Sequence, residues 1–332
     1  MVNDLSADLA AAAHVLTSAS DVTLLAHVNP DADALGSALA VGLALHRRGV
    51  KVRVSFGEPE DVPETLRGLD VAGLLVPASD VPATPAVLVA MDTGSLARLG
   101  PLADRVEATV AAGGDVIVID HHVSNTRYGT VNVVDDRAEA TAVLALKLLD
   151  ELGAEVDEPV ARCVYAGLVT DTRSFRTASP QTHRLAARLL EAGVDAEALA
   201  RPLMDTHPFD YLGMLSRVLG RARLEPDAAN GLGLVHAVVT LADADGVRSE
   251  EVESVIDVVR STSEAEVAAV LKELRPQHWT VSLRSVGEVD VRDVALLLGG
   301  GGHRHAAGFT ADGPAENVLA GLRSALDRVA AN

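Results

Sequence analysis

Short apolar runs, each ending at a polar residue, recur through the first half of the chain. Residues 21–27, 86–92 and 115–120 are near-continuous in Val, Leu, Ile and Ala, and 51–56 alternates. Such runs are typical of parallel strands that are buried on both faces. Helical patterns follow over 33–48, 138–152 and 160–169, with Gly49 as a stop signal. The alternation predicts an α/β fold with an N-terminal parallel sheet.

The second half of the chain changes character. Residues 180–223 have helical patterns, which we interpret as a connector, and a loop is expected at 225–230. Strands are then expected over 231–240, 267–271 and 280–286, and helices over 249–260 and 291–298. We therefore predict an N-terminal α/β domain over 1–185, a helical linker over 186–224 and a smaller α/β domain over 225–332.

Composition narrows the classes of function. Apolar residues make up 48% of the chain and aromatic residues only 2%, so the core is expected to consist of Val, Leu and Ala. Few aromatics and a formal charge of −19 argue against a protein that binds long nucleic acid, which needs stacking platforms and many basic contacts.

The single cysteine and the apolar runs exclude further classes. Cys163 alone forms no intramolecular disulfide or thiolate zinc site, and its apolar surroundings favour a core position. Residues 1–20 lack the basic start of a signal peptide, and the least polar stretch, 35–45, is too short to span a bilayer. We expect a cytoplasmic protein without a membrane partner.

Ligand-type side chains follow three of the predicted strands. His27 ends the first, Asp92 the third, and the Asp120-His121-His122 sequence the fourth. Since ligands of open parallel sheets gather outside the carboxyl ends of the strands, these side chains are expected to meet at one edge and form a site.

Each motif also has a plainer interpretation when taken alone. Asp31 and Asp33, which follow the Pro30 turn, could cap a helix, and Asp171 could do the same after 160–169. Asp92 could be a turn aspartate, and residues 120–122 a satisfied polar cluster. Helix capping does not explain His27, and it leaves two carboxylates close together without a cation.

Together these residues predict a metal centre. Mixed imidazole and carboxylate ligands favour Mn²⁺, with Mg²⁺ or Co²⁺ as alternatives, over an all-oxygen Ca²⁺ site. Four aspartates would neutralise two divalent ions, and ions about 3.5–4 Å apart suit phosphoryl hydrolysis.

A glycine run at 299–302 precedes His303, Arg304 and His305. No Gly-Lys-Ser/Thr sequence follows, so it is not a P-loop, but its N–H groups could approach an anion closely. A flexible turn is the alternative. Arg284 is a further candidate for binding phosphate, although a single Arg on a strand is often simply exposed.

The ordered set of His27, Asp31, Asp33, Asp92, Asp120-His121-His122, Asp171 and the Gly-Gly-Gly-His303 sequence resembles the DHH phosphoesterase superfamily. It looks most like the nanoRNase/pAp phosphatase group, whose members carry a DHH-associated C-terminal domain. The resemblance covers nearly the whole chain, and it implies an active-site cleft between the two domains.

The resemblance also implies roles for individual residues. His27, Asp31 and Asp92 would bind one metal ion, while Asp33, Asp92, His121 and Asp171 would bind the second, with Asp92 bridging. Asp120 would orient a ligand, and His122 would donate to the phosphate or to the leaving group. Asn125 and Arg98 match substrate-binding positions around the family site, and its nucleotide-binding surface is matched by Arg284, Gly300, Gly301, Gly302 and His303.

The implied reaction is two-metal hydrolysis of short oligoribonucleotides, of 3′-phosphoadenosine 5′-phosphate (pAp), or of di-adenylates such as pApA and cyclic di-AMP, to mononucleotides. The resemblance further suggests a homodimer. A pyrophosphatase or RecJ-type exonuclease of the same superfamily, or a nucleotide-binding regulator with little turnover, are the alternatives. The pyrophosphatase is disfavoured because its C-terminal domain is of a different type. The RecJ-type exonuclease is disfavoured because there is little room here for its additional nucleic-acid-binding domains.

Overall fold

The computed structural model describes residues 5–330. Residues 1–4, part of the stretch compared above with signal peptides, and residues 331–332 lie outside the described range. The chain divides between Thr206 and His207 into two units, each described by itself below. This boundary falls inside the stretch expected to be a linker.

The N-terminal unit is built on a parallel sheet with the strand order β2-β1-β3-β4-β5. Its strands are β1 (Asp21–Ala26), β2 (Lys51–Ser55), β3 (Val87–Met91), β4 (Asp115–Asp120) and β5 (Val131–Val134). The first four were predicted, β2 from its alternating pattern and the other three from their apolar runs, and β1, β3 and β4 are almost entirely buried. β5 was not predicted, because four residues interrupted by a polar Asn132 give no clear period.

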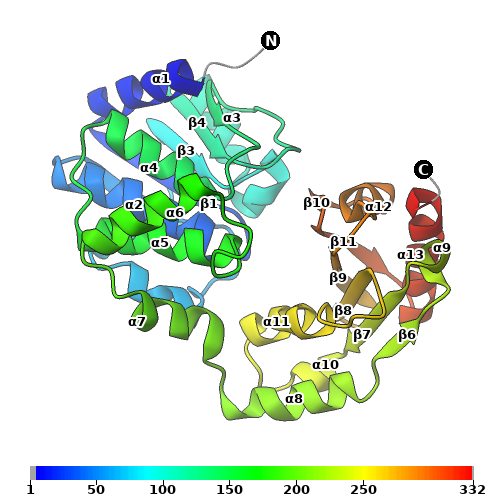
Figure 1. Ribbon diagram of the computed structural model, residues 1–332. Coiled ribbons are helices and arrows are strands. Elements are labelled where there is room, and N and C mark those ends of the chain that lie inside the picture. Colours follow the sequence, from blue (N-terminus) through cyan, green and yellow to red (C-terminus); the bar gives the residue numbers. More distant parts are fainter. Residues whose placement is uncertain (1–4, 331–332) are drawn as a thin grey trace. The chain divides into compact units, whose positions relative to one another are not determined.

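Helices cover both faces of this sheet (Figure 1). A core cluster on one face joins α1 (Leu5–Ser18), α2 (Ala32–Arg47), α4 (Thr141–Glu151) and α5 (Glu158–Asp171) to the strands. A smaller cluster on the other face includes Val106 of α3 (Asp104–Ala111) and the 3₁₀ turn Leu96–Leu102. Further 3₁₀ turns span Glu64–Leu69 and Ala78–Asp80. The predicted α/β class is confirmed.

α2 and α5 cross at unusually close range, because glycines lie at the crossing. A Cβ atom on Gly36 would lie 2.5 Å from the carbonyl oxygen of Cys163, which is buried in the core as expected. A Cβ atom on Gly167 would lie 2.5 Å from Asp33 Oδ1. The two glycines therefore let the start of α2 lie against the end of α5, where Asp33 and Asp171 are found.

The stretch predicted to be a helical connector is helical. It contains α6 (Pro180–Glu191), α7 (Ala196–Ala200), a π-helical turn (Arg201–Asp205) and α8 (Phe209–Leu219). α6 and α7 belong to the N-terminal unit, and α8 belongs to the C-terminal unit.

The C-terminal unit has a mixed sheet with the order β10-β11-β9-β8-β7-β6. Its strands are β6 (Arg223–Glu225), β7 (Leu234–Val239), β8 (Val267–Arg275), β9 (His278–Ser285), β10 (Gly301–His303) and β11 (Ala306–Asp312). β7 pairs with β8 in parallel, and the other neighbours run antiparallel. The predicted strands at β7, β8 and β9 are confirmed.

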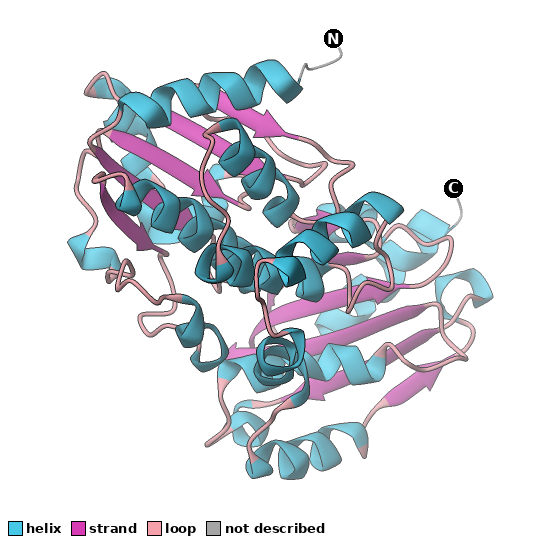
Figure 2. Ribbon diagram, turned by 60° about the vertical axis from the view of Figure 1, so that its left-hand side comes forward, coloured by secondary structure: helices cyan, strands magenta, loops and turns pink. Residues whose placement is uncertain are grey.

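Two layers of helices enclose this second sheet, and Figure 2 shows helices on both of its faces. One face packs against α8, α10 (Leu241–Ala244) and α11 (Ser249–Val259), and the other against α9 (Ala228–Gly231), α12 (Val291–Leu297) and α13 (Ala315–Ala330). α11 and α12 were predicted. The loop expected at 225–230 was wrong in part, since it contains the end of β6 and most of the short α9.

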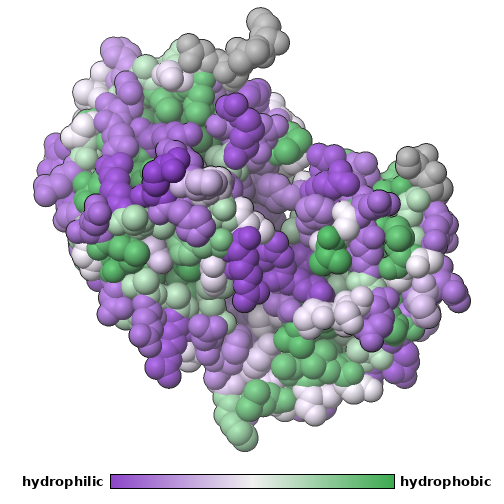
Figure 3. All heavy atoms as spheres, in the orientation of Figure 1, coloured by the Kyte–Doolittle hydropathy of each residue, from purple (hydrophilic) through white to green (hydrophobic). Residues whose placement is uncertain are grey.

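Hydrophilic residues cover much of the face seen in Figure 3, and apolar residues gather at its bottom, over α8. There Phe209 and Leu212 are exposed, while Tyr211 and Met214 of the same helix are buried. Within residues 5–330, no helix is long and apolar enough to cross a membrane.

Candidate metal centre

The predicted ligands meet at the carboxyl edge of the N-terminal sheet. β1, β3 and β4 are neighbours in register, so their ends lie side by side. They deliver His27, Asp92 and the Asp120–His122 sequence to one place. The start of α2 adds Asp31 and Asp33, and the end of α5 adds Asp171.

Asp92 lies at the centre of this cluster and is buried. Its Oδ2 atom is 3.4 Å from His27 Nε2, and its Oδ1 atom is 3.5 Å from His121 Nε2. His27 Nε2 is also 3.4 Å from Asp31 Oδ2, and His121 Nε2 is 3.5 Å from Asp171 Oδ2. These separations exceed the usual hydrogen-bond range of about 2.7–3.2 Å. They approach the spacing of about 3 Å expected for neighbouring ligand atoms around one ion.

Three groups of possible ligand atoms share Asp92; one of them contains Asp120 and His122, and the other two consist of the predicted metal ligands. The first of these two is His27, Asp31 and Asp92, and the second is Asp33, Asp92 and His121; within each group the ligand atoms lie within 4.8 Å of one another. The carboxylate of Asp92 thus presents one oxygen to each of these two groups. This arrangement could hold two metal ions.

Backbone carbonyls orient the two histidines. His27 Nδ1 lies 2.8 Å from the carbonyl oxygen of Val28, and His121 Nδ1 lies 3.1 Å from that of Ala138. Because a carbonyl oxygen can only accept, Nδ1 carries the proton in each ring. In the neutral ring the Nε2 lone pair then points toward the carboxylates, as a metal ligand requires.

Asp31 combines the two interpretations that the sequence left open. Its Oδ1 atom caps α2, accepting from the backbone N–H groups of Asp33 and Ala34. Its Oδ2 atom faces His27. Helix capping therefore fixes the orientation of a candidate ligand.

Asp33, in the first turn of α2, is fully buried, and its carboxylate lies against the N-terminus of α4. Its two oxygens accept from the backbone N–H groups of Thr141 (2.7 Å) and Ala142 (2.8 Å). The hydroxyl of Thr141 donates to Asp92 Oδ1 at 2.7 Å. Thr141 thus holds one carboxylate with its backbone and another with its side chain.

Thr141 and Gly167 were missed by sequence reasoning. A Thr at the start of a helix and a Gly within one are common, so neither stands out in a single sequence. Their proximity to Asp33 depends on the packing of α4 and α5 against α2.

The Asp120–His122 sequence divides into two roles. Asp120 is fully buried. Its Oδ1 atom lies 2.7 Å from His122 Nδ1, and its Oδ2 atom accepts a hydrogen bond from Asn125 Nδ2 at 2.5 Å. Asn125 also donates to the carbonyl oxygen of Thr93. The carboxylate of Asp120 therefore orients His122, whereas His121 is oriented by the Ala138 carbonyl. We had expected Asp120 to orient a ligand, and Asn125 to contact substrate.

The pKa values of the cluster reflect crowded charge. Burial raises the pKa of Asp33 and Asp171 well above the usual value, and the charges of neighbouring aspartates raise it further. Burial lowers the pKa of His27, but Asp31 and Asp92 outweigh it and raise the value to about 10. Carboxylates in this number require positive charge, which divalent ions would supply.

The other predicted residues come from other elements of the two units. Arg98 is exposed in a 3₁₀ turn, where its carbonyl oxygen accepts from the N–H of Val28 at 2.8 Å and so supports the loop after β1. Arg284 lies on β9, and Gly300, Gly301, Gly302 and His303 lie at β10, all in the C-terminal unit. The expected flexible turn is partly replaced by a strand, since Gly301–His303 forms β10.

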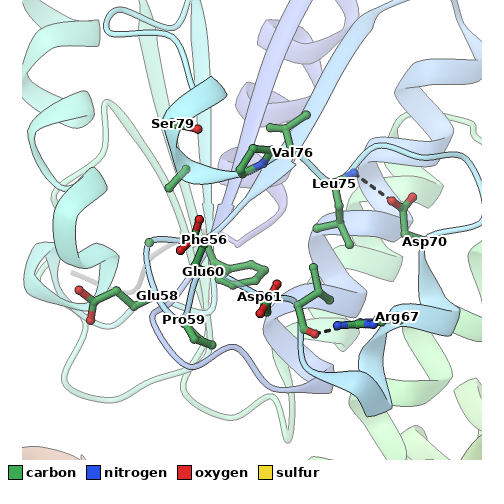
Figure 4. Close-up of a pocket in the computed structure, with 14 residues that line it drawn as sticks. Phe56, Glu58, Pro59, Glu60, Asp61, Arg67, Asp70, Leu75, Val76 and Ser79 are labelled. Atoms are coloured by element: carbon green, nitrogen blue, oxygen red, sulfur yellow. Dashed lines mark hydrogen bonds between the residues drawn. The ribbon is translucent and has the colours of Figure 1, made fainter.

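A cavity of about 650 Å³ is lined by the loop that follows β2 and by residues 75–79 (Figure 4). Phe56, Leu75 and Val76 line it, and Glu58, Glu60 and Asp61 line it as well. The carbonyl oxygen of Glu58 accepts from the N–H of Asn29, which lies between His27 and Asp31. Asp70 and Arg67 also line it, and four carboxylates against one guanidinium disfavour an anionic substrate.

Comparisons with known proteins match both halves of the chain. The DHH family N-terminal domain matches residues 21–168, and the DHHA1 domain matches residues 232–332. The bifunctional oligoribonuclease and PAP phosphatase NrnA of Thermus thermophilus is 33% identical over 92% of this chain and 90% of its own. The chain belongs to the DHH family.

A second relative is similar along most of its length, and a solved structure has the same fold. The probable bifunctional oligoribonuclease and PAP phosphatase NrnA of Streptococcus mutans is 27% identical over 88% of this chain and 89% of its own. An exopolyphosphatase-related protein from Bacteroides fragilis has the same fold, with a TM-score of 0.85 and 21% identity over 98% of this chain and 97% of its own.

The DHH match contains all the candidate ligands except Asp171, which lies just beyond its end at residue 168. Arg284, the glycine run and His303 fall within the DHHA1 match. The order in which the family's two domains occur is therefore the order predicted from the sequence.

Proposed function

We propose that this protein is a two-metal phosphoesterase that hydrolyses short oligoribonucleotides, pAp and di-adenylates to mononucleotides. The observation that carries the proposal is the position of Asp92, whose two oxygens face His27 and His121 separately. Two NrnA relatives named as oligoribonuclease and PAP phosphatase support the substrate class.

The donor set fits two divalent ions. His27, Asp31 and Asp92 would hold one, and Asp33, Asp92, His121 and Asp171 the other. Mixed imidazole and carboxylate donors favour Mn²⁺. When bound, such ions lower the pKa of coordinated water and stabilise charge on phosphate oxygens.

His122 is the proposed acid of the reaction. Burial lowers its pKa, but Asp120 and Asp92 outweigh burial and raise the value to about 9, so the ring carries a proton to donate near neutral pH. The Asp120–Asn125 pair fixes the ring through Nδ1. Nε2 is then the atom that donates to the phosphate or to the leaving oxygen.

The DHHA1 unit is proposed to bind the nucleotide. Arg284 and His303 supply donors, and the backbone at Gly300–Gly302 can approach an anion without interference from side chains. A small substrate needs few contacts. This is consistent with an acidic chain that has few aromatic residues and is not expected to bind long nucleic acid.

A substrate panel tests the proposal. Purified protein with Mn²⁺ is offered pAp, pApA, cyclic di-AMP and pyrophosphate at equal concentration, with and without EDTA. We expect release of AMP from pAp and pApA, abolished by EDTA. Hydrolysis of pyrophosphate alone would assign the chain to a different activity, and no hydrolysis of any substrate would indicate a binding protein.

A further inference from the structure

One face of the C-terminal sheet is covered by helices over only part of its width. α8 and α11 pack mainly over β7 and β8 on this face, and α11 reaches β9 with fewer contacts. On β9 the residues of the same face, Thr280, Ser282 and Arg284, stay partly exposed, while the alternate residues Val281 and Leu283 are buried on the other face. β9 therefore carries an open row of polar side chains.

Lys272 lies on β8 at the border of this open region. It is only 2% exposed, although a lysine is costly to bury. Its ammonium donates to Glu253 and, at 2.8 Å, to Ser282 Oγ. An ammonium has three donors and no acceptor, so the oxygen of Ser282 must be the acceptor in this contact.

The direction of the Ser282 proton follows from that contact. A hydroxyl that accepts from Lys272 still has its own proton to donate. Among residues 5–330 no acceptor for it is found. Ser282 faces Gly308 of β11 in the register, and a glycine has no side chain to cover it. The donor is left on the open face, beside Arg284.

We propose that Ser282 donates a hydrogen bond to a phosphate oxygen of the bound nucleotide, next to Arg284, and that Lys272 is the positioning residue that sets this direction. The proposal rests on the proposed function and adds to it a preference for ligand groups that accept hydrogen bonds. A phosphate ester offers acceptors and matches the donor, whereas a ligand group that only donates would not be bound here.

Binding to the full-length protein in EDTA tests this without catalysis. Isothermal titration with AMP and with adenosine compares wild type, Ser282→Ala, Ser282→Thr and Lys272→Met. We expect Ser282→Ala and Lys272→Met to weaken AMP binding about tenfold, as for a lost hydrogen bond to a charged group, and to leave adenosine unchanged. Ser282→Thr keeps the hydroxyl and should keep the affinity for AMP.

The double variant separates positioning from a structural role. If Lys272 acts through Ser282, Lys272→Met should weaken AMP binding no further when Ser282→Ala is already present. Ser261→Ala, at an exposed serine of the same unit, and Lys51→Met, at an exposed lysine, serve as controls.

Three results would overturn the proposal. Two of them are AMP binding to Ser282→Ala as tight as to wild type, and an equal loss of adenosine and AMP binding. A wild type that binds AMP no better than adenosine would do the same. Failure of the proposed function is seen separately, as lack of hydrolysis by the Mn²⁺-loaded wild type.

Discussion

Thr141 donates its hydroxyl to Asp92 Oδ1, while its backbone N–H donates to Asp33 Oδ2. One residue at the start of α4 thus fixes two carboxylates that the proposed mechanism assigns to metal ions. The hydroxyl bond leaves Oδ2 of Asp92 to face His27. Substitutions at Thr141 should therefore weaken metal binding more than they destabilise the fold.

Thr141→Val keeps the shape of the side chain and removes the hydroxyl. Asp92 loses a buried hydrogen bond, and we expect about tenfold weaker Mn²⁺ binding, the effect of about 1.4 kcal/mol. Isothermal titration with Mn²⁺ measures it. Thr23→Val is the matched control, because Thr23 is equally buried and its hydroxyl has no partner among the described residues. An equal loss of affinity in both variants would count against the role of Thr141.

Gly167→Ala tests the space that Asp33 occupies. The new Cβ atom would lie 2.5 Å from Asp33 Oδ1 and 2.9 Å from Ala142 Cβ, so the carboxylate must move. We expect loss of Mn²⁺ binding and an unfolding free energy lower by about 1–3 kcal/mol, as for an overpacked core. Gly321→Ala, in a helix with nothing within 4 Å of the added atom, should bind Mn²⁺ as wild type does. Normal Mn²⁺ binding by Gly167→Ala would show that Asp33 is not needed.

The adjacent histidines should separate in their effects. His121→Gln removes a proposed ligand, so Mn²⁺ affinity should fall. His122→Gln removes a proposed proton donor, so kcat should fall about 100-fold while Mn²⁺ affinity stays near that of wild type. Titration calorimetry and steady-state kinetics on the same samples distinguish the two. Loss of Mn²⁺ binding in both variants to the same degree would contradict the division of roles.

Much of the fold could be predicted from the sequence, because buried parallel strands carry continuous apolar runs. β1, β3 and β4 end at His27, Asp92 and Asp120, and their parallel order makes those residues neighbours. β10 was missed, since four glycines indicate a turn as readily as a strand. The cleft expected between the two domains stays a prediction.

Contacts between distant segments were beyond the sequence. Thr141 lies 108 positions after Asp33, and no local pattern connects them. Likewise, three consecutive polar residues do not reveal that Asp120 orients His122, while the carbonyl of Ala138 orients His121. The direction of each ring depends on the loop that follows β4 and β5, and on the start of α4.

Metal binding should also stabilise the N-terminal unit. Buried carboxylates repel one another without cations, and a ligand present at 100 times its Kd stabilises the native state by about 2.7 kcal/mol. Mn²⁺ should therefore raise the midpoint of thermal unfolding by several degrees, as followed by circular dichroism. Asp92→Asn, which lacks the shared carboxylate, should show a much smaller rise, and an unchanged rise would place the ions elsewhere.

The central claim is that the Asp92 cluster holds two ions and that both are needed for hydrolysis. The most direct measurement titrates EDTA-treated, dialysed protein with Mn²⁺ and records the rate of AMP release from pAp at each step. The account predicts no activity without metal and a plateau at about two Mn²⁺ per chain, with Asp92→Asn inactive throughout. Full activity of the metal-free protein, or of Asp92→Asn, would contradict it.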